Sequence, residues 1–144
     1  MHTYEDDLVA WGEEQAIALR DHRGDKLDWE HLAEEIEGLV ASEKRSLKSQ
    51  IRRLIMRLLK WDKQSSLRSR SWANTIENAR EEIKEALEEK PSLRNNTEEF
   101  TVTMYRRAVR DAENETGISK RDFPEECPFT FEEIMAIPCS LGAA

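Results

Sequence analysis

The stretch that decides the fold is residues 42–61, SEKRSLKSQIRRLIMRLLKW. Placed on a helix at 100° per residue, its apolar side chains fall within an arc about 160° wide, and basic side chains occupy much of the remaining surface. The pattern predicts an amphipathic helix with a buried apolar side and an exposed basic side. The apolar residues are Leu47, Ile51, Leu54, Ile55, Leu58, Leu59 and Trp61.

The size and composition of the chain favour one helical domain. Its 144 residues can form a single core. A content of 38% hydrophobic and 36% charged residues, with few glycines and prolines, suits a helical globular protein better than a sheet protein or a disordered chain. We expect an all-α bundle of four main helices with a Pro-rich C-terminal segment and a short terminal helix. The expected domain covers residues 1–144, with a core of about 3–116 and a wrapping segment of 117–144.

Several classes of protein lack support in the sequence. No apolar run reaches the about 20 residues that a membrane span needs, and the N-terminus is acidic where a signal peptide would be basic. We therefore expect a cytoplasmic protein. Cys127 and Cys139 form neither a disulfide framework nor a CxxC motif. No Gly-rich phosphate loop, GxSxG or HExxH motif is present, and we expect no cofactor.

The net charge of −8 hides a strong asymmetry along the chain. Residues 1–43 carry a charge of −10, residues 44–80 carry +9 and residues 81–144 carry −7. An acidic total disfavours indiscriminate binding of nucleic acid, which depends on phosphate neutralisation. We expect the basic face of the central helix to meet the acidic helices of this chain or an acidic protein partner. That face consists of Lys48, Arg52, Arg53, Arg57 and Lys60.

Apolar residues at helical spacing, together with capping residues, predict five helices. Thr3 is the expected N-cap of the first helix, and Asp28 that of the second. Gly38 is the expected point at which the long second helix bends, because glycine within a helix costs about 1 kcal/mol relative to alanine. Thr130 and Glu133 form a capping-box pattern before the last helix. The expected helices cover about residues 3–24, 28–63, 71–89, 92–115 and 131–136.

Four of these helices carry a polar side chain within the stripe that is expected to face the core. The stripes include Leu8, Leu19, Ile36 and Leu39, and the polar residues are Gln15, Glu43, Arg80 and Asp111. Because a buried charge must be paired, we predict an interior network in which Arg80 meets Glu43, Asp111 or both. In a simple hairpin Arg80 would lie about 13 Å from Glu43, which favours Asp111. Such a network would fix helix register; the alternative is a polar pocket that binds a small anion or metabolite through Arg80.

His31, Glu34 and Glu35 are spaced so that two metal ligands could share one face of a helix. Di-metal carboxylate bundles use the order Glu-x-x-His twice, with further carboxylates, whereas here the order is reversed and occurs once. We therefore predict no metal site and interpret His31 as a partly exposed hydrogen-bonding residue.

The basic helix and the residues after it resemble a nucleic-acid-binding surface in composition. Trp61, Arg68, Arg70 and Trp72 follow one another closely. However, aromatic residues do not interleave with the basic ones along the helix face, and the flanking segments are acidic. We therefore regard nucleic acid as a weaker interpretation than a protein partner.

Several motifs occur in order from Tyr4 to Ile134: YEDDLVAW, LDWEHLAEEIEGL, SEKRSLKSQ, LLKW, RSRSWANTI, KPSL and FPEECPFTFEEI. In combination they resemble the bacterial family catalogued as domain of unknown function 29. The resemblance implies a compact all-helical fold and a small single-domain protein. It implies no established activity, substrate or cofactor, and it supplies no catalytic residues. The family's motif positions correspond to Trp11, Asp28, Trp29, Glu34, Glu35, Glu43, Lys60, Trp61, Arg70, Trp72 and Arg80.

These observations favour a non-enzymatic protein-interaction module, with self-association as a homodimer as one form of that function. The alternative is a small-ligand-binding or enzymatic bundle with a polar site. The third interpretation is nucleic-acid binding through the basic face of the central helix. The residues of the alternative polar site are Glu35, Glu43, Arg70 and Arg80, with Asp111 in the same network.

Overall fold

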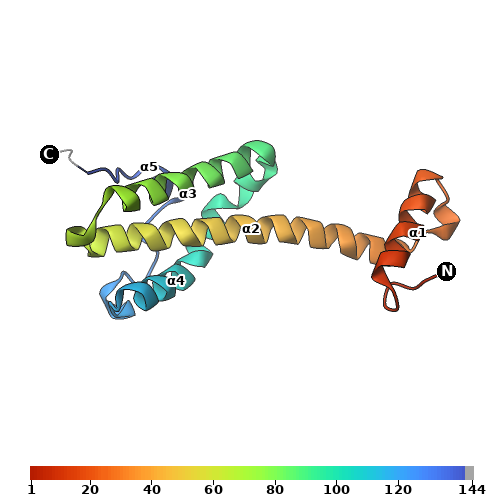
Figure 1. Ribbon diagram of the computed structural model, residues 1–144, viewed down its shortest axis with the longest axis horizontal. Coiled ribbons are helices and arrows are strands. Elements are labelled where there is room, and N and C mark those ends of the chain that lie inside the picture. Colours follow the sequence, from red (N-terminus) through yellow and green to blue (C-terminus); the bar gives the residue numbers. More distant parts are fainter. Residues whose placement is uncertain (142–144) are drawn as a thin grey trace. The chain divides into compact units, whose positions relative to one another are not determined.

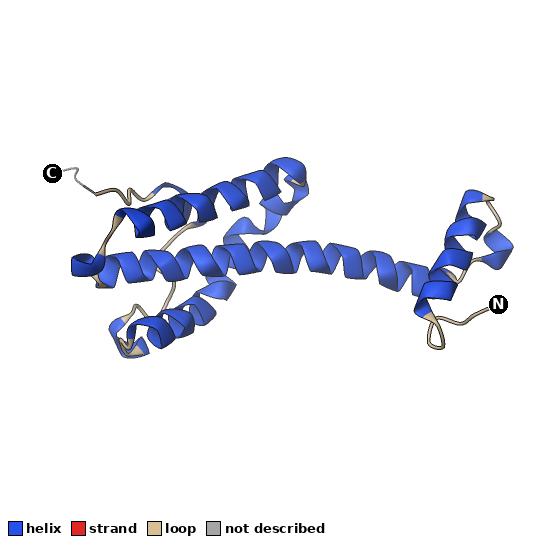
Figure 2. Cartoon of the chain, viewed as in Figure 1, coloured by secondary structure: helices blue, strands red, loops and turns tan. Residues whose placement is uncertain are grey.

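The computed structural model describes residues 1–141, and every regular element in them is helical (Figures 1 and 2). The α-helices are α1 (Leu8–Arg20), α2 (Trp29–Lys63), α3 (Arg70–Glu89), α4 (Thr97–Thr116) and α5 (Phe131–Ala136). Short 3-10 helices join them: η1 (Gly24–Lys26), η2 (Ser65–Leu67), η3 (Pro91–Asn96) and η4 (Lys120–Asp122). The predicted class, an all-α protein with four main helices and a short terminal helix, is confirmed. Within residues 1–141, no helix is both long and apolar enough to cross a membrane.

The last helix begins and ends as predicted, whereas the first is shorter. Thr130 and Glu133 form the expected capping box of α5. The prediction that Thr3 caps α1 is wrong, because Thr3 instead exchanges side-chain and backbone hydrogen bonds with Asp6 in a separate turn. Asp7 is the actual N-cap, and its carboxylate accepts from the backbone N–H of Ala10 at 3.0 Å.

The fourth predicted helix also differs at its start. Residues 91–96 wind into η3 before the α-helix begins at Thr97. Pro91 lies in the first turn of η3, where its missing N–H is tolerated. The predicted end is confirmed, since Gly117 closes α4 in the left-handed conformation at φ 75°.

The contacts of the chain divide it into two compact units, Met1–Glu43 and Lys44–Ala144. We call them the first unit and the second unit and describe each by itself. The first unit contains α1, η1 and the beginning of α2. The second unit contains the remainder of α2 and all later elements. That residues 1–144 form one domain stays a prediction.

The core of the second unit is built on the part of α2 that the sequence singled out. In Figure 1 this part of α2 lies between α3 and α4, and side chains from all three helices form one buried cluster. Phe123 and Ile134 bring the C-terminal segment onto the same cluster. The fully buried side chains include Leu47, Ile51, Leu54, Ile55, Ile76, Ile83 and Ile134.

The expected bend at Gly38 does not interrupt the helix, because α2 is helical from Trp29 to Lys63. A Cβ atom added at Gly38 would meet no heavy atom within 4 Å. Its neighbours Glu37 and Leu39 are good helix formers, and they carry the helix across the glycine.

Replacing Gly38 with alanine is therefore expected to stabilise this part of α2 by about 1 kcal/mol. The gain comes from the lower conformational entropy of the unfolded chain. Hydrogen exchange of the surrounding amides measures it, and slower exchange is the expected result. Gly117→Ala is the contrasting control, because its φ of 75° strains any residue with a Cβ and should reverse the sign. Unchanged or faster exchange around the substituted position would contradict a continuous helix.

Candidate functional site

Asp28 is the centre of the hydrogen-bond network that holds the first unit together. Its carboxylate accepts from Trp11 Nε1 at 3.0 Å and from the backbone N–H of His31 at 3.3 Å, and it lies 2.7 Å from His31 Nδ1. The backbone N–H of Asp28 donates to Gln15 Oε1 at 2.7 Å. Asp28 thus caps α2, as predicted, and also ties the start of α2 to α1. Gln15 is buried, as its place in the α1 stripe predicted.

Aromatic rings surround this network. Tyr4 stacks on His31 with ring centroids 4.3 Å apart, and it meets the edge of Trp11 at 4.9 Å. The Tyr4 hydroxyl donates a hydrogen bond to Glu35. On its other side, His31 Nε2 lies 3.3 Å from a carboxylate oxygen of Glu5. The imidazole therefore has a carboxylate at each nitrogen and a ring on its face.

These contacts set the protonation of the cluster. The hydrogen bond between His31 and Asp28 raises the pKa of His31 above its ordinary value and lowers the pKa of Asp28. The hydrogen bond to Glu35 raises the pKa of the Tyr4 hydroxyl, because a nearby carboxylate disfavours the phenolate. These shifts favour the charged forms of His31 and Asp28 and the neutral form of the Tyr4 hydroxyl.

The spacing of His31, Glu34 and Glu35 does not gather a set of metal ligands. His31 is turned toward Asp28 and Glu5, and Glu35 accepts from Tyr4. Within residues 1–141, no group of three or more His, Cys, Asp or Glu residues could hold a metal ion.

The first unit leaves large apolar side chains exposed along α2. We call Trp29, Ile36, Leu39 and Val40 the α2 apolar face; their exposed fractions are 67%, 61%, 69% and 51%. The prediction that Ile36 and Leu39 face a core is wrong, because this unit contains too few elements to cover them. The same holds for Leu8 and Leu19 of α1, which are 53% and 49% exposed.

Arg80 is buried, as predicted, but its partners are different. Nε donates to Ile134 O at 3.0 Å, Nη2 to Ile137 O at 2.7 Å and Nη1 to Glu77 Oε1 at 3.1 Å. The two carbonyls lie at the C-terminal end of α5, where a cation is favourable. The predicted pairing of Arg80 with Asp111 is wrong, since Asp111 accepts two hydrogen bonds from Arg52 at 2.6 and 2.8 Å.

The other residues of the predicted polar network are not among the hydrogen-bond partners of Arg80. Glu43 is exposed, which contradicts its predicted inward direction. Glu35 belongs to the Tyr4 cluster of the first unit. Arg70 is exposed, and it lines the same surface hollow as Arg80 and Cys139, with a volume of about 730 Å³. Each nitrogen of the Arg80 guanidinium already donates to a protein oxygen. Two of these oxygens are carbonyls at the end of α5, so the cation holds α5 in place.

The basic face of α2 has intramolecular partners throughout. Arg52 pairs with Asp111, and Lys60 pairs with Glu115 at 2.7 Å. The other contacts are Arg53 with Glu82 at 3.7 Å, Arg57 with Thr75 O at 3.0 Å and Lys48 over the Phe100 ring at 4.9 Å. These contacts support the interpretation that the acidic helices of the chain neutralise this face, and they weaken the case for nucleic acid there.

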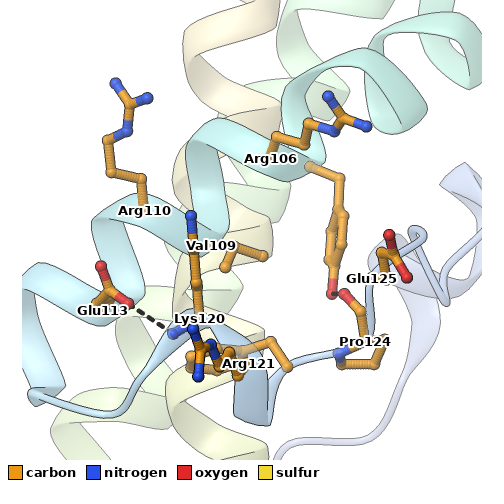
Figure 3. A pocket seen from close by; sticks show the side chains of 10 residues that line it. Arg106, Val109, Arg110, Glu113, Lys120, Arg121, Pro124 and Glu125 are labelled. Carbon is orange, nitrogen blue, oxygen red and sulfur yellow. Dashed lines mark hydrogen bonds between the residues drawn. The ribbon is translucent and has the colours of Figure 1, made fainter.

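A pocket between α4 and η4, with a volume of about 660 Å³, was not anticipated from the sequence (Figure 3). Its basic side chains are Arg106 and Arg110 from α4 and Lys120 and Arg121 from η4. Glu113, Glu125, Tyr105, Val109, Phe123 and Pro124 complete the lining. The available signal was the pair Arg106 and Arg110, four residues apart on one helical face, followed by the basic pair after Ser119. Alone, such a pattern is typical of a solvated surface.

The fold and these sites define the class as an all-helical protein with a helix-rich core, an acidic N-terminal unit and no metal-ligand cluster within residues 1–141. The chain belongs to the family described as "Domain of unknown function DUF29", whose model matches residues 3–138. No curated protein and no solved structure matches the chain.

Proposed function

We propose that the chain is a non-enzymatic interaction module that binds a basic amphipathic segment of another protein on the α2 apolar face. The exposure of Ile36, Leu39 and Val40 carries the proposal, because contiguous exposed apolar side chains mark interaction surfaces. Trp29 adds a large aromatic side chain of the kind that anchors protein interfaces.

The charge of the first unit indicates the chemistry of the partner. Residues 1–43 carry 13 acidic and 3 basic side chains. Glu30, Glu34 and Glu37 are exposed on the same helical segment as the α2 apolar face. A basic partner gains from this field, whereas two copies joined through their first units would each meet a charge of −10. The favoured occupant is therefore a basic protein segment, and a second copy of the chain is the competing outcome.

The test uses a synthetic amphipathic peptide of leucine and lysine, with a leucine–glutamate peptide as its charge-reversed counterpart. Isothermal titration calorimetry on the full chain is expected to show binding of the basic peptide only. The double substitution Ile36→Ser and Leu39→Ser should weaken that binding at least about tenfold, because it removes two apolar contacts. Val102→Ser is the matched control, since Val102 is 58% exposed on α4 in the second unit.

Three results would overturn the proposal. The first is binding of the basic peptide that the serine pair leaves unchanged. The second is a dimer in size-exclusion chromatography with light scattering that the same pair dissociates, which would make a second copy the occupant. Absence of binding at about millimolar peptide would also exclude an interaction of useful strength.

A further inference from the structure

The pocket between α4 and η4 has the size and walls of a small-molecule site. Its volume of about 660 Å³ falls within the range typical of such pockets, about 300–1,000 Å³. The buried side chains of Tyr105, Val109 and Phe123 form its apolar part. The basic residues of the lining come from two elements. Figure 3 shows Lys120 extending from η4 toward α4, whereas the guanidinium groups of Arg106 and Arg110 extend from α4 away from η4. The pocket thus combines an apolar floor with a cationic rim.

The charges of that rim differ from those of the basic face of α2. Arg106, Arg110, Lys120 and Arg121 form no side-chain ion pair within residues 1–141, whereas Arg52 and Lys60 of α2 are paired. Glu113 accepts from the backbone N–H of Lys120 at 2.5 Å, so this carboxylate is engaged by the backbone. Like charges four residues apart on a helix repel one another, and an anion between them would relieve that repulsion.

The loop that carries half of the rim is held in place. The Tyr105 hydroxyl donates to Pro124 O at 2.6 Å, which fixes the loop to α4. Within η4, the backbone N–H of Asp122 donates to Ser119 O at 2.9 Å. Gly117 turns the chain sharply from the end of α4 into this loop. A site on a fixed loop loses little conformational entropy when it binds a ligand.

We propose that this pocket binds a small molecule that carries two or more phosphate groups. Guanidinium groups match phosphate oxygens in shape and bond them in pairs, and Arg106, Arg110 and Arg121 supply three of them. Lys120 adds a point charge at the same rim. The apolar floor offers a surface for the organic part of the ligand. An extended nucleic acid fits less well, because Glu113 and Glu125 interrupt the rim and the chain carries −8 overall.

The test titrates the full chain with inorganic pyrophosphate and tripolyphosphate at constant ionic strength. NMR chemical shifts of the amides from residue 105 to residue 125 report the site. Saturable binding is expected, with tripolyphosphate tighter than pyrophosphate and sulfate weaker than both. The double substitution Arg110→Gln and Arg121→Gln should weaken it at least about tenfold, because it removes two guanidinium contacts.

The matched control is Arg94→Gln with Arg107→Gln, which removes the same charge from exposed positions outside the pocket. This pair should leave the affinity within about twofold, since neither side chain lines the pocket. If both double substitutions lower the affinity equally, the anion is attracted by the general surface charge and the proposal is wrong. Polyphosphate binding that does not saturate at several millimolar would also overturn the proposal. So would a single-stranded oligonucleotide that binds more tightly than tripolyphosphate and loses the same affinity in both double variants.

Discussion

Replacing Arg80 with alanine is expected to lower the free energy of unfolding of the second unit by about 3–5 kcal/mol, since hydrogen bonds from a charged donor contribute about 1.5–3 kcal/mol each. The substitution leaves Ile134 O and Ile137 O without their donor at the end of α5. It also removes a long side chain that is 7% exposed, which leaves a gap in the packing. Urea denaturation followed by circular dichroism measures the loss.

The chemistry of Cys139 separates local release of α5 from global unfolding. Cys139 is 9% exposed beside Arg80, and burial raises the pKa of its thiol. If α5 and the residues after it detach in Arg80→Ala, Cys139 should react with a thiol reagent in the absence of denaturant. Cys127, which is half-buried, serves as the internal reference.

Arg70→Ala is the matched control, because Arg70 lines the same hollow and is exposed. It should change stability by less than about 0.5 kcal/mol. Arg80→Lys should recover only part of the loss, since an ammonium cannot reach two carbonyls in the fixed geometry of a guanidinium. Wild-type stability and an unreactive Cys139 in Arg80→Ala would show that the cation does not hold α5.

The helices could be predicted from the sequence because local rules determine them. Helical spacing placed Leu47, Ile51 and Leu54 on the buried side of α2, and capping chemistry located α5 to the residue. The same rules found that Arg80 is buried. They could not find its partners, because the approach of α5 to α3 joins residues more than fifty positions apart.

The wrong predictions for the first unit arise because an amphipathic pattern describes only the helix itself. The spacing of Ile36 and Leu39 shows that a helix has an apolar side, but it does not show that anything covers that side. The same reason applies to Glu43. Its spacing places it within the apolar stripe of α2, but that stripe is not buried at this position. The pocket at α4 was missed for a related reason, since Arg110 and Arg121 line one pocket only because the chain turns at Gly117.

The stability of the first unit is expected to depend on pH through His31 and Asp28. The folded-state pKa of His31 is raised above its ordinary value of 6.5, so the stabilisation from the imidazolium is complete below 6.5 and is lost as pH rises through the raised value. The pKa of Asp28 is lowered below 3.8, so its contribution is complete above 3.8 and is lost as pH falls through the lowered value. The charges of Glu5 and Glu34 also raise the pKa of His31 and add to the first effect.

The stabilisation that this pair gives to the first unit should therefore be greatest between pH 3.8 and 6.5, the ordinary values of the two groups. Exchange of the Trp11 indole N–H, observed by NMR, reports it directly, because that proton is donated to Asp28. Asp28→Asn should speed this exchange on the order of tenfold at pH 6, since it removes the negative charge that accepts from the indole and lies opposite His31. It should also reduce the decline above pH 6.5 to the smaller part that Glu5 and Glu34 supply, whereas Asp25→Asn, whose carboxylate pairs with exposed Arg23, should preserve the full decline. A wild-type profile in Asp28→Asn would mean that the aromatic contacts of Tyr4 and Trp11, and not the ion pair, hold the unit together.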